Sequence, residues 1–212
     1  MNGAKVYDRR MGKTLGRAEI PWETVEAVID FLEPLHCSVD CFQNDRGLMA
    51  RKYYDRLEQY VTHPPSFALV KRTREPVDDL KEAVLAGGGS VQKLQAYFPD
   101  LELRPKVMEQ CKLVFPDLVQ AISMPANLEF NAPDATKGNG LRTLCRCLGI
   151  DPREAAAFGD GTNDLSLLQE AGIGVAMANG APETLAAADL TAPSNEEDGV
   201  AQILSRWFPP NT

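Results

Sequence analysis

The stretch from Ala155 to Asn179, AAAFGDGTNDLSLLQEAGIGVAMAN, constrains the fold more than any other part of the chain. A short apolar run, residues 155–158, is bounded by a glycine and predicts a buried strand. Residues 173–177 form a second run of this kind, and apolar residues recur at helical spacing between the two runs, up to a glycine that ends the helix. A strand, a helix and a strand joined so closely predict a parallel sheet.

A polar loop separates the first predicted strand from the helix. Asp160 follows the strand directly, and either Asn163 or Asp164 can cap the helix. Ligands of parallel sheets bind at the carboxyl ends of the strands, which is where Asp160 is expected. Two carboxylates with an amide between them suit a hard cation such as Mg2+, which usually takes one or two carboxylates together with phosphate and water. The alternative is that these residues only form a turn.

Lys137 lies at the start of another predicted helix. Leu141, Leu144 and Leu148 follow it at helical spacing. A solvated lysine is the commoner case at such a position, but a cation is slightly misplaced there because the helix dipole favours anions. A lysine directed toward the same strand ends as Asp160 would hold a phosphate group as a point charge.

Together these segments resemble the third and fourth motifs of the haloacid dehalogenase superfamily, and most closely those of its Cof-type phosphatases. The resemblance rests on Lys137-Gly138 before a helix and on residues 158–164, FGDGTND. It continues, in the order of the family, through residues 174–179, 188–189 and 194–200. These motifs cover the last third of the chain densely and the first two thirds more loosely.

The resemblance implies an α/β fold with two parts. One part is a Rossmann-like core, a parallel sheet with flanking helices, and the other is an inserted α+β cap domain. Residues 1–17 would be a remnant of the core, residues 18–131 the cap, and residues 132–212 the C-terminal part of the core.

Asn2 and Gly3 match a segment that ends a core strand in the family, and by resemblance they bind substrate. In the family two motifs precede this segment: one contains Asp-x-Asp and the other a Ser or Thr. We therefore expect the N-terminal part of the core to be missing from this chain. Asp8 does not match the Asp-x-Asp motif, because no second carboxylate lies two residues after Asp8 and no buried strand comes before it.

The resemblance also implies the chemistry of phosphate-ester hydrolysis with Mg2+. An aspartate of the first motif attacks phosphorus, and a second aspartate protonates the leaving group. Carried onto this sequence, Lys137 is the phosphate clamp and Asp160 the Mg2+ ligand. Asp164 supports the metal directly or through water, and Asn163 orients phosphate or substrate. The nucleophile and the general acid have no matching positions.

The composition of the chain limits which classes of partner and which cellular compartment we expect. The net charge of −8 and the pI near 4.9 argue against nucleic acid and against anionic membranes as main partners. No apolar run approaches the roughly 18 residues of a transmembrane helix, and the first residues lack the apolar core of a signal peptide. The five cysteines are scattered, which is typical of reduced thiols in a cytoplasmic protein. Cys37 and Cys41 suggest a metal site only weakly, since no second ligand pair follows.

The remaining segments predict alternating helices and strands. A helix starts near Pro21, and the glycines at 87–89 form a flexible turn and the best candidate for a mobile joint. The other expected elements are a polar hairpin at 5–17, strands at 37–42, 66–70, 91–97 (with Lys93, which resembles a cap lysine of the family), 120–124 and 126–130, and helices near 76–84, 107–114 and 200–207.

Three functions remain open. The first is a phosphatase of small phosphorylated metabolites whose chain is cut short and which is inactive or weak alone. The second is a non-catalytic protein that keeps a phosphate and Mg2+ pocket. The third is one half of a split phosphatase, completed by a partner chain that supplies the missing core segment. We favour the first because Lys137, Asp160, Asn163 and Asp164 are all intact.

Overall fold

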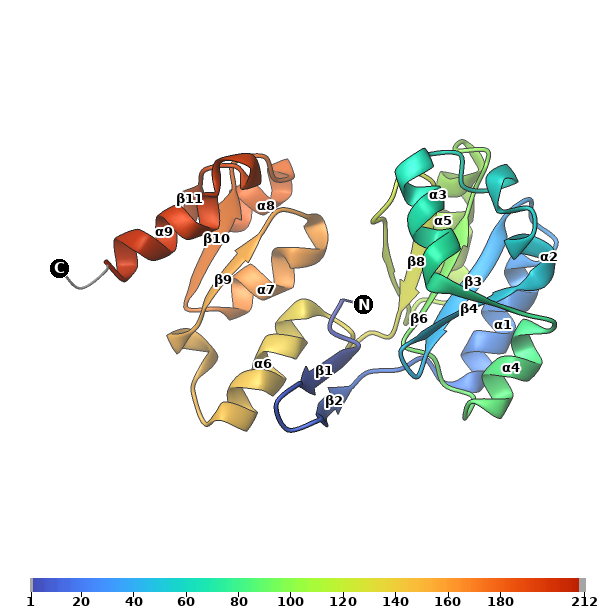
Figure 1. Cartoon of the computed structure of the whole chain (residues 1–212), viewed down its shortest axis with the longest axis horizontal. Helices are drawn as coiled ribbons and strands as arrows, with labels where there is room; N and C mark the ends of the chain where they lie inside the picture. Colours follow the sequence, from blue (N-terminus) through green and yellow to red (C-terminus); the bar gives the residue numbers. More distant parts are fainter. Residues whose placement is uncertain (1, 210–212) are drawn as a thin grey trace. The chain divides into compact units, whose positions relative to one another are not determined.

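The computed structural model describes residues 2–209 and divides them into two compact units (Figure 1). Unit 1 comprises residues 18–135, and unit 2 comprises residues 2–17 together with 136–209. Residues 1 and 212, the outer limits of the predicted domains, lie outside the described residues. The compact units divide after Arg17 and after Ala135, and the division into core and cap at residues 17 and 131 stays a prediction.

Unit 2 contains a parallel sheet of three strands in the order β11-β10-β9. The strands are β9 (Ala156–Gly159), β10 (Ile173–Met177) and β11 (Leu190–Ala192). The strand–helix–strand unit predicted between residues 155 and 177 is therefore confirmed. Among the described residues β9 has a neighbouring strand on one side only, so its other edge is open.

Helices cover both faces of this sheet. α9 (Gly199–Trp207) packs on one face, where Ile203 joins Val175 and Met177. α6 (Lys137–Leu148) and α7 (Leu165–Glu170) pack on the other, where Leu168 joins Ala157. The remaining elements are α8 (Pro182–Ala187) and the short 3-10 turns η2 (Pro152–Glu154), η3 (Thr162–Asp164) and η4 (Asn195–Glu197).

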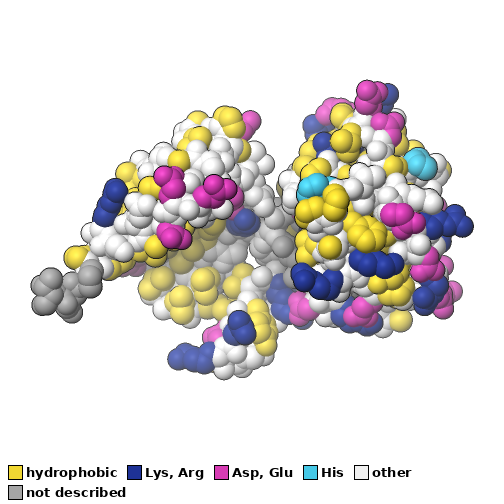
Figure 2. Space-filling model, turned by 45° about the horizontal axis from the view of Figure 1, so that its top comes forward, with side chains coloured by type: hydrophobic (Ala, Val, Ile, Leu, Met, Phe, Trp, Pro, Cys, Tyr) yellow, Lys and Arg dark blue, Asp and Glu magenta, His cyan; other side chains and the backbone are white. Residues whose placement is uncertain are grey.

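Two of the predicted apolar helix faces in unit 2 are only partly buried. Leu148 of α6 is 63% exposed and Leu204 of α9 is 40% exposed, although both helices begin and end close to the predicted residues. Hydrophobic side chains reach the surface in both units (Figure 2). The periodicity identified these helices correctly, but it does not say how much of each face is covered within the described residues.

The predicted hairpin is confirmed as β1 (Lys5–Asp8) and β2 (Lys13–Arg17), an antiparallel pair. It packs against α6, and the contact is tightest at Gly16, which has no side chain. A Cβ on Gly16 would lie 2.8 Å from the Thr143 side chain, and one on Gly140 would lie 3.8 Å from Val6. The first residues of the chain are thereby joined to the helix that starts at Lys137.

Unit 1 is built on a six-stranded mixed sheet with the order β5-β4-β3-β6-β8-β7. β4 and β5 are parallel, and the other neighbours are antiparallel. The strands are β3 (Ser38–Gln43), β4 (Arg46–Ala50), β5 (Arg74–Val77), β6 (Lys93–Tyr97), β7 (Val119–Ala121) and β8 (Asn127–Asn131).

Five helices and one 3-10 turn complete unit 1. They are α1 (Trp22–Leu32), α2 (Arg51–Tyr54), η1 (Leu57–Gln59), α3 (Pro64–Thr73), α4 (Leu80–Ala86) and α5 (Leu103–Val114). The predicted stripe of α1 is confirmed, since Val25, Val28, Ile29 and Leu32 are its buried residues. The segment from α2 to α3 packs on Met49 and Tyr97 of the sheet.

Two predictions for unit 1 are wrong, and one strand was missed. Residues 66–70 belong to α3, because Ser66 and Val70 are buried one helical turn apart. Pro76 and Val77 end β5, and the helix starts only at Leu80, where Asp79 caps it. The strand β4 was not predicted at all. The glycine turn at 87–89 lies inside unit 1, between α4 and β6, and its role as a mobile joint stays a prediction.

No helix in residues 2–209 is long and apolar enough to cross a membrane.

Candidate functional site

The loop between β9 and α7 positions the two predicted carboxylates. Asp160 follows the last residue of β9, and Asp164 ends the 3-10 turn η3 before α7. The chain can bend this tightly because Gly159 has no side chain: a Cβ there would overlap the Cβ of Asp164. The side chain of Asp164 therefore folds back beneath the end of the strand and does not cap α7, which is one of the roles predicted for it.

Asp164 is the buried centre of the site. One carboxylate oxygen, Oδ1, accepts a hydrogen bond from the ammonium group of Lys137. The other, Oδ2, accepts from the backbone N–H groups of Asp160 and Gly161, both at 3.0 Å. Asp164 is only 3% exposed. Burial acts to raise its pKa, but the hydrogen bonds from Lys137, Gly161 and Asp160 together hold the pKa below its ordinary value.

Lys137 is the first residue of α6, as the sequence predicts. Thr136 caps the helix by accepting a hydrogen bond from the N–H of Asn139 at 3.1 Å. The next residue, Gly138, approaches α7 so closely that its N–H donates to Ser166 Oγ at 3.2 Å. The lysine is therefore fixed by its helix cap, by the contact with α7 and by its ion pair with Asp164.

Thr136 and Ser166 are the positioning residues that sequence reasoning missed. A signal for Thr136 was present, because a threonine directly before a predicted helix is a usual N-cap. Ser166 offered no such signal, since its role depends on how closely α6 and α7 pack.

Asp160 differs from Asp164 in that its side chain is exposed. Its backbone is held at both polar groups: the N–H donates to Asp164, and the carbonyl oxygen accepts from Ala181 N–H at 2.8 Å. Within residues 2–209 the carboxylate itself accepts no hydrogen bond. A rigid backbone with an open carboxylate is the arrangement that a metal ligand at a strand end requires.

The start of the chain also reaches this loop. The Asn163 side-chain Nδ2 donates to Asn2 Oδ1 at 3.1 Å. Gly3 has a φ of +89°, and a Cβ there would overlap the carbonyl oxygen of Thr136, so only glycine fits. The contacts of Asn2 and Gly3 thus bring them next to the loop and to the start of α6. The six predicted site residues form one group, although they come from both ends of the sequence.

The donor set fits Mg2+ in part. Mg2+ prefers oxygen ligands and keeps several waters, so one open carboxylate beside a bound phosphate can suffice. Asp160 offers that carboxylate. Asp164 already accepts three hydrogen bonds, one at Oδ1 and two at Oδ2, so only one of its roughly four lone-pair directions is left for a metal ion or its water. Among the described residues no group of three or more His, Cys, Asp or Glu could hold a metal.

Cys37 and Cys41, the two thiols that suggest a metal site only weakly, are both buried in unit 1. Burial and the neighbouring Cys111 raise the pKa of Cys37 to about 12, and burial also raises the pKa of Cys41 strongly. Without a metal, both thiols are therefore held in the neutral form, and metals bind the thiolate.

Unit 1 has a buried polar cluster on one face of its sheet. Arg74 Nε donates to Asp40 Oδ2 at 2.8 Å, and Lys93 Nζ donates to Glu129 Oε1 at 2.7 Å. Tyr97 links the cluster by accepting from Arg74 at 3.1 Å. Lys93, the lysine suggested by resemblance, is therefore paired inside the unit. Both ion pairs join residues of one sheet, but within residues 2–209 the buried Oδ1 of Asp40 accepts no hydrogen bond.

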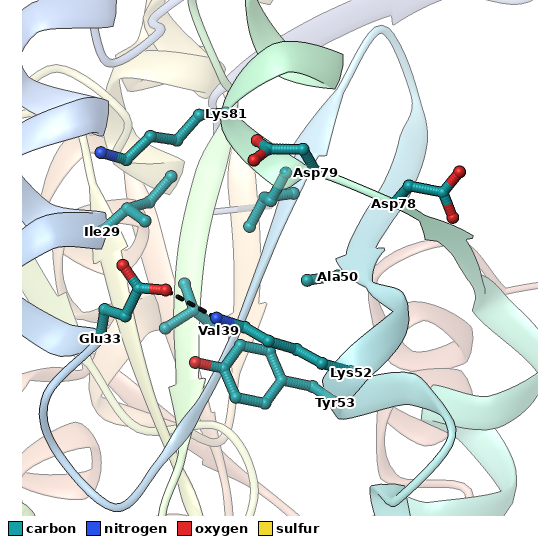
Figure 3. A pocket seen from close by; sticks show the side chains of 10 residues that line it. Ile29, Glu33, Val39, Ala50, Lys52, Tyr53, Asp78, Asp79 and Lys81 are labelled. Carbon is teal, nitrogen blue, oxygen red and sulfur yellow. Dashed lines mark hydrogen bonds and ion pairs between the residues drawn. The ribbon is translucent and has the colours of Figure 1, made fainter.

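A pocket of about 250 Å³ lies elsewhere in unit 1, between α1, α4 and the end of β4 (Figure 3). Ile29, Val39 and Ala50 form its apolar floor. Lys52 crosses it and donates to Glu33 Oε1 at 2.6 Å (Figure 3). None of the predicted site residues lines this pocket, and both of its lysines, Lys52 and Lys81, are already paired with carboxylates, so we assign it no function.

Comparisons with known proteins agree on a family. A sequence model of haloacid dehalogenase-like hydrolases matches residues 1–204. The putative phosphatase YxeH of Bacillus subtilis is 45% identical over 209 residues, which cover 96% of this chain and 72% of that protein. The chloroplastic endoribonuclease YBEY of Arabidopsis thaliana is 48% identical over 80 residues, 38% of this chain and 14% of that protein. A putative phosphatase of Haemophilus influenzae is 42% identical over 95 residues, which cover 45% of this chain and 36% of that protein. The matched region therefore spans from 14% to 72% of the length of these three relatives.

Solved structures share the fold. A haloacid dehalogenase-like hydrolase from Bacteroides thetaiotaomicron superposes with a TM-score of 0.79 at 25% identity, covering 98% of this chain and 74% of that one. A protein of Thermotoga maritima gives 0.76 at 27% identity, covering 100% and 74%. The predicted α/β architecture with a Rossmann-like core is confirmed. By sequence and by fold, the chain belongs to the haloacid dehalogenase-like hydrolases, and its relatives include proteins named as phosphatases.

Proposed function

We propose that the chain is part of a Mg2+-dependent phosphatase that hydrolyses small phosphorylated metabolites in the cytoplasm. The observation that carries the proposal is the ion pair of Lys137 and Asp164 at the carboxyl end of β9, beside the open carboxylate of Asp160. An ammonium group fixed next to an open carboxylate provides one charge for a phosphate group and one for its metal. Positioning and charge neutralisation are the main means by which proteins promote phosphoryl transfer.

Each residue has a distinct part in this proposal. Lys137 holds phosphoryl oxygens with the ammonium protons that Asp164 leaves available. Asp160 is a direct ligand of Mg2+, which supplies further neutralisation of phosphate charge when bound. Asp164 keeps Lys137 charged and in place, and it supports the metal through water. Asn163, together with Asn2 and Gly3, orients the substrate.

The nucleophile and the general acid are not among these residues, so we propose that further polypeptide supplies them. The open edge of β9 supports this, because an unpaired strand edge can accept another strand. So do the apolar side chains that unit 2 exposes outside residues 5–17, which are Leu144, Leu148, Ile150, Ile173, Leu190, Val200, Leu204 and Phe208. The added segment belongs either to a longer form of this chain or to a separate partner chain.

The first test is the intact mass of the native protein. A mass well above 23.2 kDa, the mass of the 212 residues, would mean that the native chain is longer. A panel of phosphorylated metabolites should then reveal Mg2+-dependent hydrolysis by that longer protein. A mass of 23.2 kDa would direct the search to a partner chain that restores hydrolysis when it is added.

The second test measures phosphate binding by calorimetry in the presence of Mg2+, on the 212-residue chain. Lys137→Met should weaken binding at least about tenfold, since a charge-assisted hydrogen bond contributes about 1.5–3 kcal/mol. The matched control is Lys112→Met, an exposed lysine of α5 in unit 1 that should leave binding unchanged. Binding that is insensitive to Lys137 would refute the proposed clamp. Binding that depends on Lys137, without hydrolysis by any longer form or complex, would favour the non-catalytic alternative.

A further inference from the structure

The hairpin of residues 5–17, here called the basic hairpin, has a charge opposite to that of the rest of the chain. It contains five cationic residues and one aspartate, so its net charge is +4, whereas the whole chain carries −8. The other residues therefore carry −12. The cations are Lys5, Arg9, Arg10, Lys13 and Arg17. Nothing in the proposed phosphatase chemistry requires this concentration of positive charge.

The turn of the basic hairpin is exposed but well formed. Residues 9–13 are all exposed, and Met11 is 64% exposed. Asp8 Oδ1 accepts hydrogen bonds from the backbone N–H groups of Arg10 and Met11, at 2.8 and 3.0 Å. Gly12 provides the positive φ of +62° that the turn needs. Such local bonds hold the turn in shape without a partner, so less conformational entropy is lost when it binds one.

An aromatic side chain lies beside the cations. Tyr7 is 48% exposed, and Lys5 Nζ lies 4.9 Å from the centre of its ring. The opposite face of the hairpin packs on α6, so this face is the one left for contacts. Tyr, Met and Arg are the residue types enriched at protein–protein interfaces, and Tyr and Arg often dominate their binding energy. The exposed set here consists of Tyr7, Met11, three arginines and one further lysine.

We propose that the basic hairpin binds an acidic segment of a partner protein. Arg9 and Arg10 pair with carboxylates of that segment, because the guanidinium group matches a carboxylate through two parallel hydrogen bonds. Met11 and Tyr7 pack on apolar side chains between the carboxylates. A protein segment can contact the hairpin alone. An extended polyanion, such as RNA or an anionic bilayer, would also meet the residues that carry −12, which repel it.

The test is fluorescence anisotropy with the full chain and a labelled twelve-residue peptide that contains six Glu or Asp and two Leu. Binding should weaken as salt rises. The triple variant R9S/R10S/K13S should lose about tenfold or more, since each exposed ion pair contributes roughly 0.2–1 kcal/mol and three are removed. Met11→Ser should lose about three- to tenfold through lost apolar contact. The same peptide with Gln and Asn in place of its acids should not bind.

The matched control is R56S/R72S/K106S, which removes three exposed cations of unit 1 and changes the net charge equally. It should leave peptide binding within about twofold. Circular dichroism verifies the fold, and the single variants R10E and M11S preserve the test if the triple variant does not fold. None of these measurements depends on phosphatase activity.

Three results would overturn the proposal. The first is peptide binding that the hairpin variants leave unchanged. The second is tighter binding of a twelve-nucleotide oligouridylate or of phosphatidylglycerol vesicles through the same residues, which would assign the hairpin to nucleic acid or to a membrane surface. The third is salt-sensitive self-association that R9S/R10S/K13S abolishes, because the occupant would then be a second copy of this chain.

Discussion

Asp164 shows how much a single side chain can decide in this site. Its sequence position suggested metal support, and that role stays a prediction. Both of its carboxylate oxygens accept hydrogen bonds from the protein: Oδ1 from Lys137, and Oδ2 from the backbone N–H groups of Asp160 and Gly161. A buried carboxylate with this many donors is stabilised in its charged form. At the scale of the residue, Asp164 is therefore a positioning group for the lysine and for the loop.

The first prediction concerns the pH dependence of this group. The pKa of Asp164 in the folded chain lies below its ordinary value of 3.8. The charged form is thus favoured by folding, and its contribution to stability is present above about pH 4 and is lost as pH falls through the folded pKa. Asp164→Asn should lower the free energy of unfolding at pH 7 by about 1–3 kcal/mol, the usual cost for a buried group that loses its partners.

Denaturant titrations between pH 7 and pH 2 measure this effect. The difference between the original chain and Asp164→Asn should shrink below about pH 4, as Asp164 becomes protonated in the original chain. Asp160→Asn is the control, because its side chain is exposed and a surface substitution usually changes stability by about 0.5 kcal/mol or less. A difference that stays constant over the whole pH range would contradict the assignment of the low pKa to Asp164.

At the scale of the element, the sequence predicted the helices and strands whose periodicity is long or whose ends are marked. α1 has a complete apolar stripe and a proline after it, and β10 is an apolar run between glycine and asparagine. α3 was missed because SFALV is a short apolar run, which periodicity alone cannot assign to strand or helix. β4 was missed because its signal lies in the turn before it: Asn44 and Asp45 both have positive φ, at 49° and 66°, and make a tight hairpin.

The second prediction concerns the two glycines in the first turn of α6, of which Gly138 has no room for a side chain and Gly140 has room for one. A Cβ on Gly138 would overlap the carbonyl oxygen of Ser166, so Gly138→Ala must push α6 and α7 apart. We expect a loss of about 1–3 kcal/mol in the free energy of unfolding, as for other overpacked contacts. Lys137 would move with the helix, so phosphate binding should also weaken.

Gly140→Ala is the matched control within the same helix. A Cβ there would lie 3.6 Å from Gly3, which is an ordinary contact. Alanine is the better helix former by about 1 kcal/mol, so this variant should be neutral or more stable. Thermal unfolding of both variants decides the matter: a Gly138→Ala protein as stable as Gly140→Ala would mean that the close packing of α6 on α7 is not required.

At the scale of the whole molecule, the group of site residues in unit 2 combines two distant parts of the sequence. Lys137, Asp160, Asn163 and Asp164 come from residues 137–164, whereas Asn2 and Gly3 come from the start of the chain. The sequence identified these residues through motifs, since motif residues carry chemistry that few other patterns share. It could not identify the ion pair of Lys137 and Asp164, because such a contact depends on how two helices meet. Nor could it predict that leucines of α6 are exposed, since periodicity shows that a helix has an apolar face but not which other elements bury that face.

The last prediction follows from how the two units are built along the chain. Unit 1 is one continuous segment, and all six strands of its sheet are paired within it. Unit 2 joins two segments, and within its described residues the parallel sheet has three strands with an open edge at β9. A fragment of residues 18–135 should therefore fold alone and unfold in one cooperative transition, as single domains of this size usually do.

A fragment of residues 136–209 lacks the hairpin that covers α6, and it should show no cooperative transition. Thermal unfolding followed by circular dichroism compares the two fragments with the full chain. A non-cooperative 18–135 fragment would mean that the stability of unit 1 depends on residues outside it.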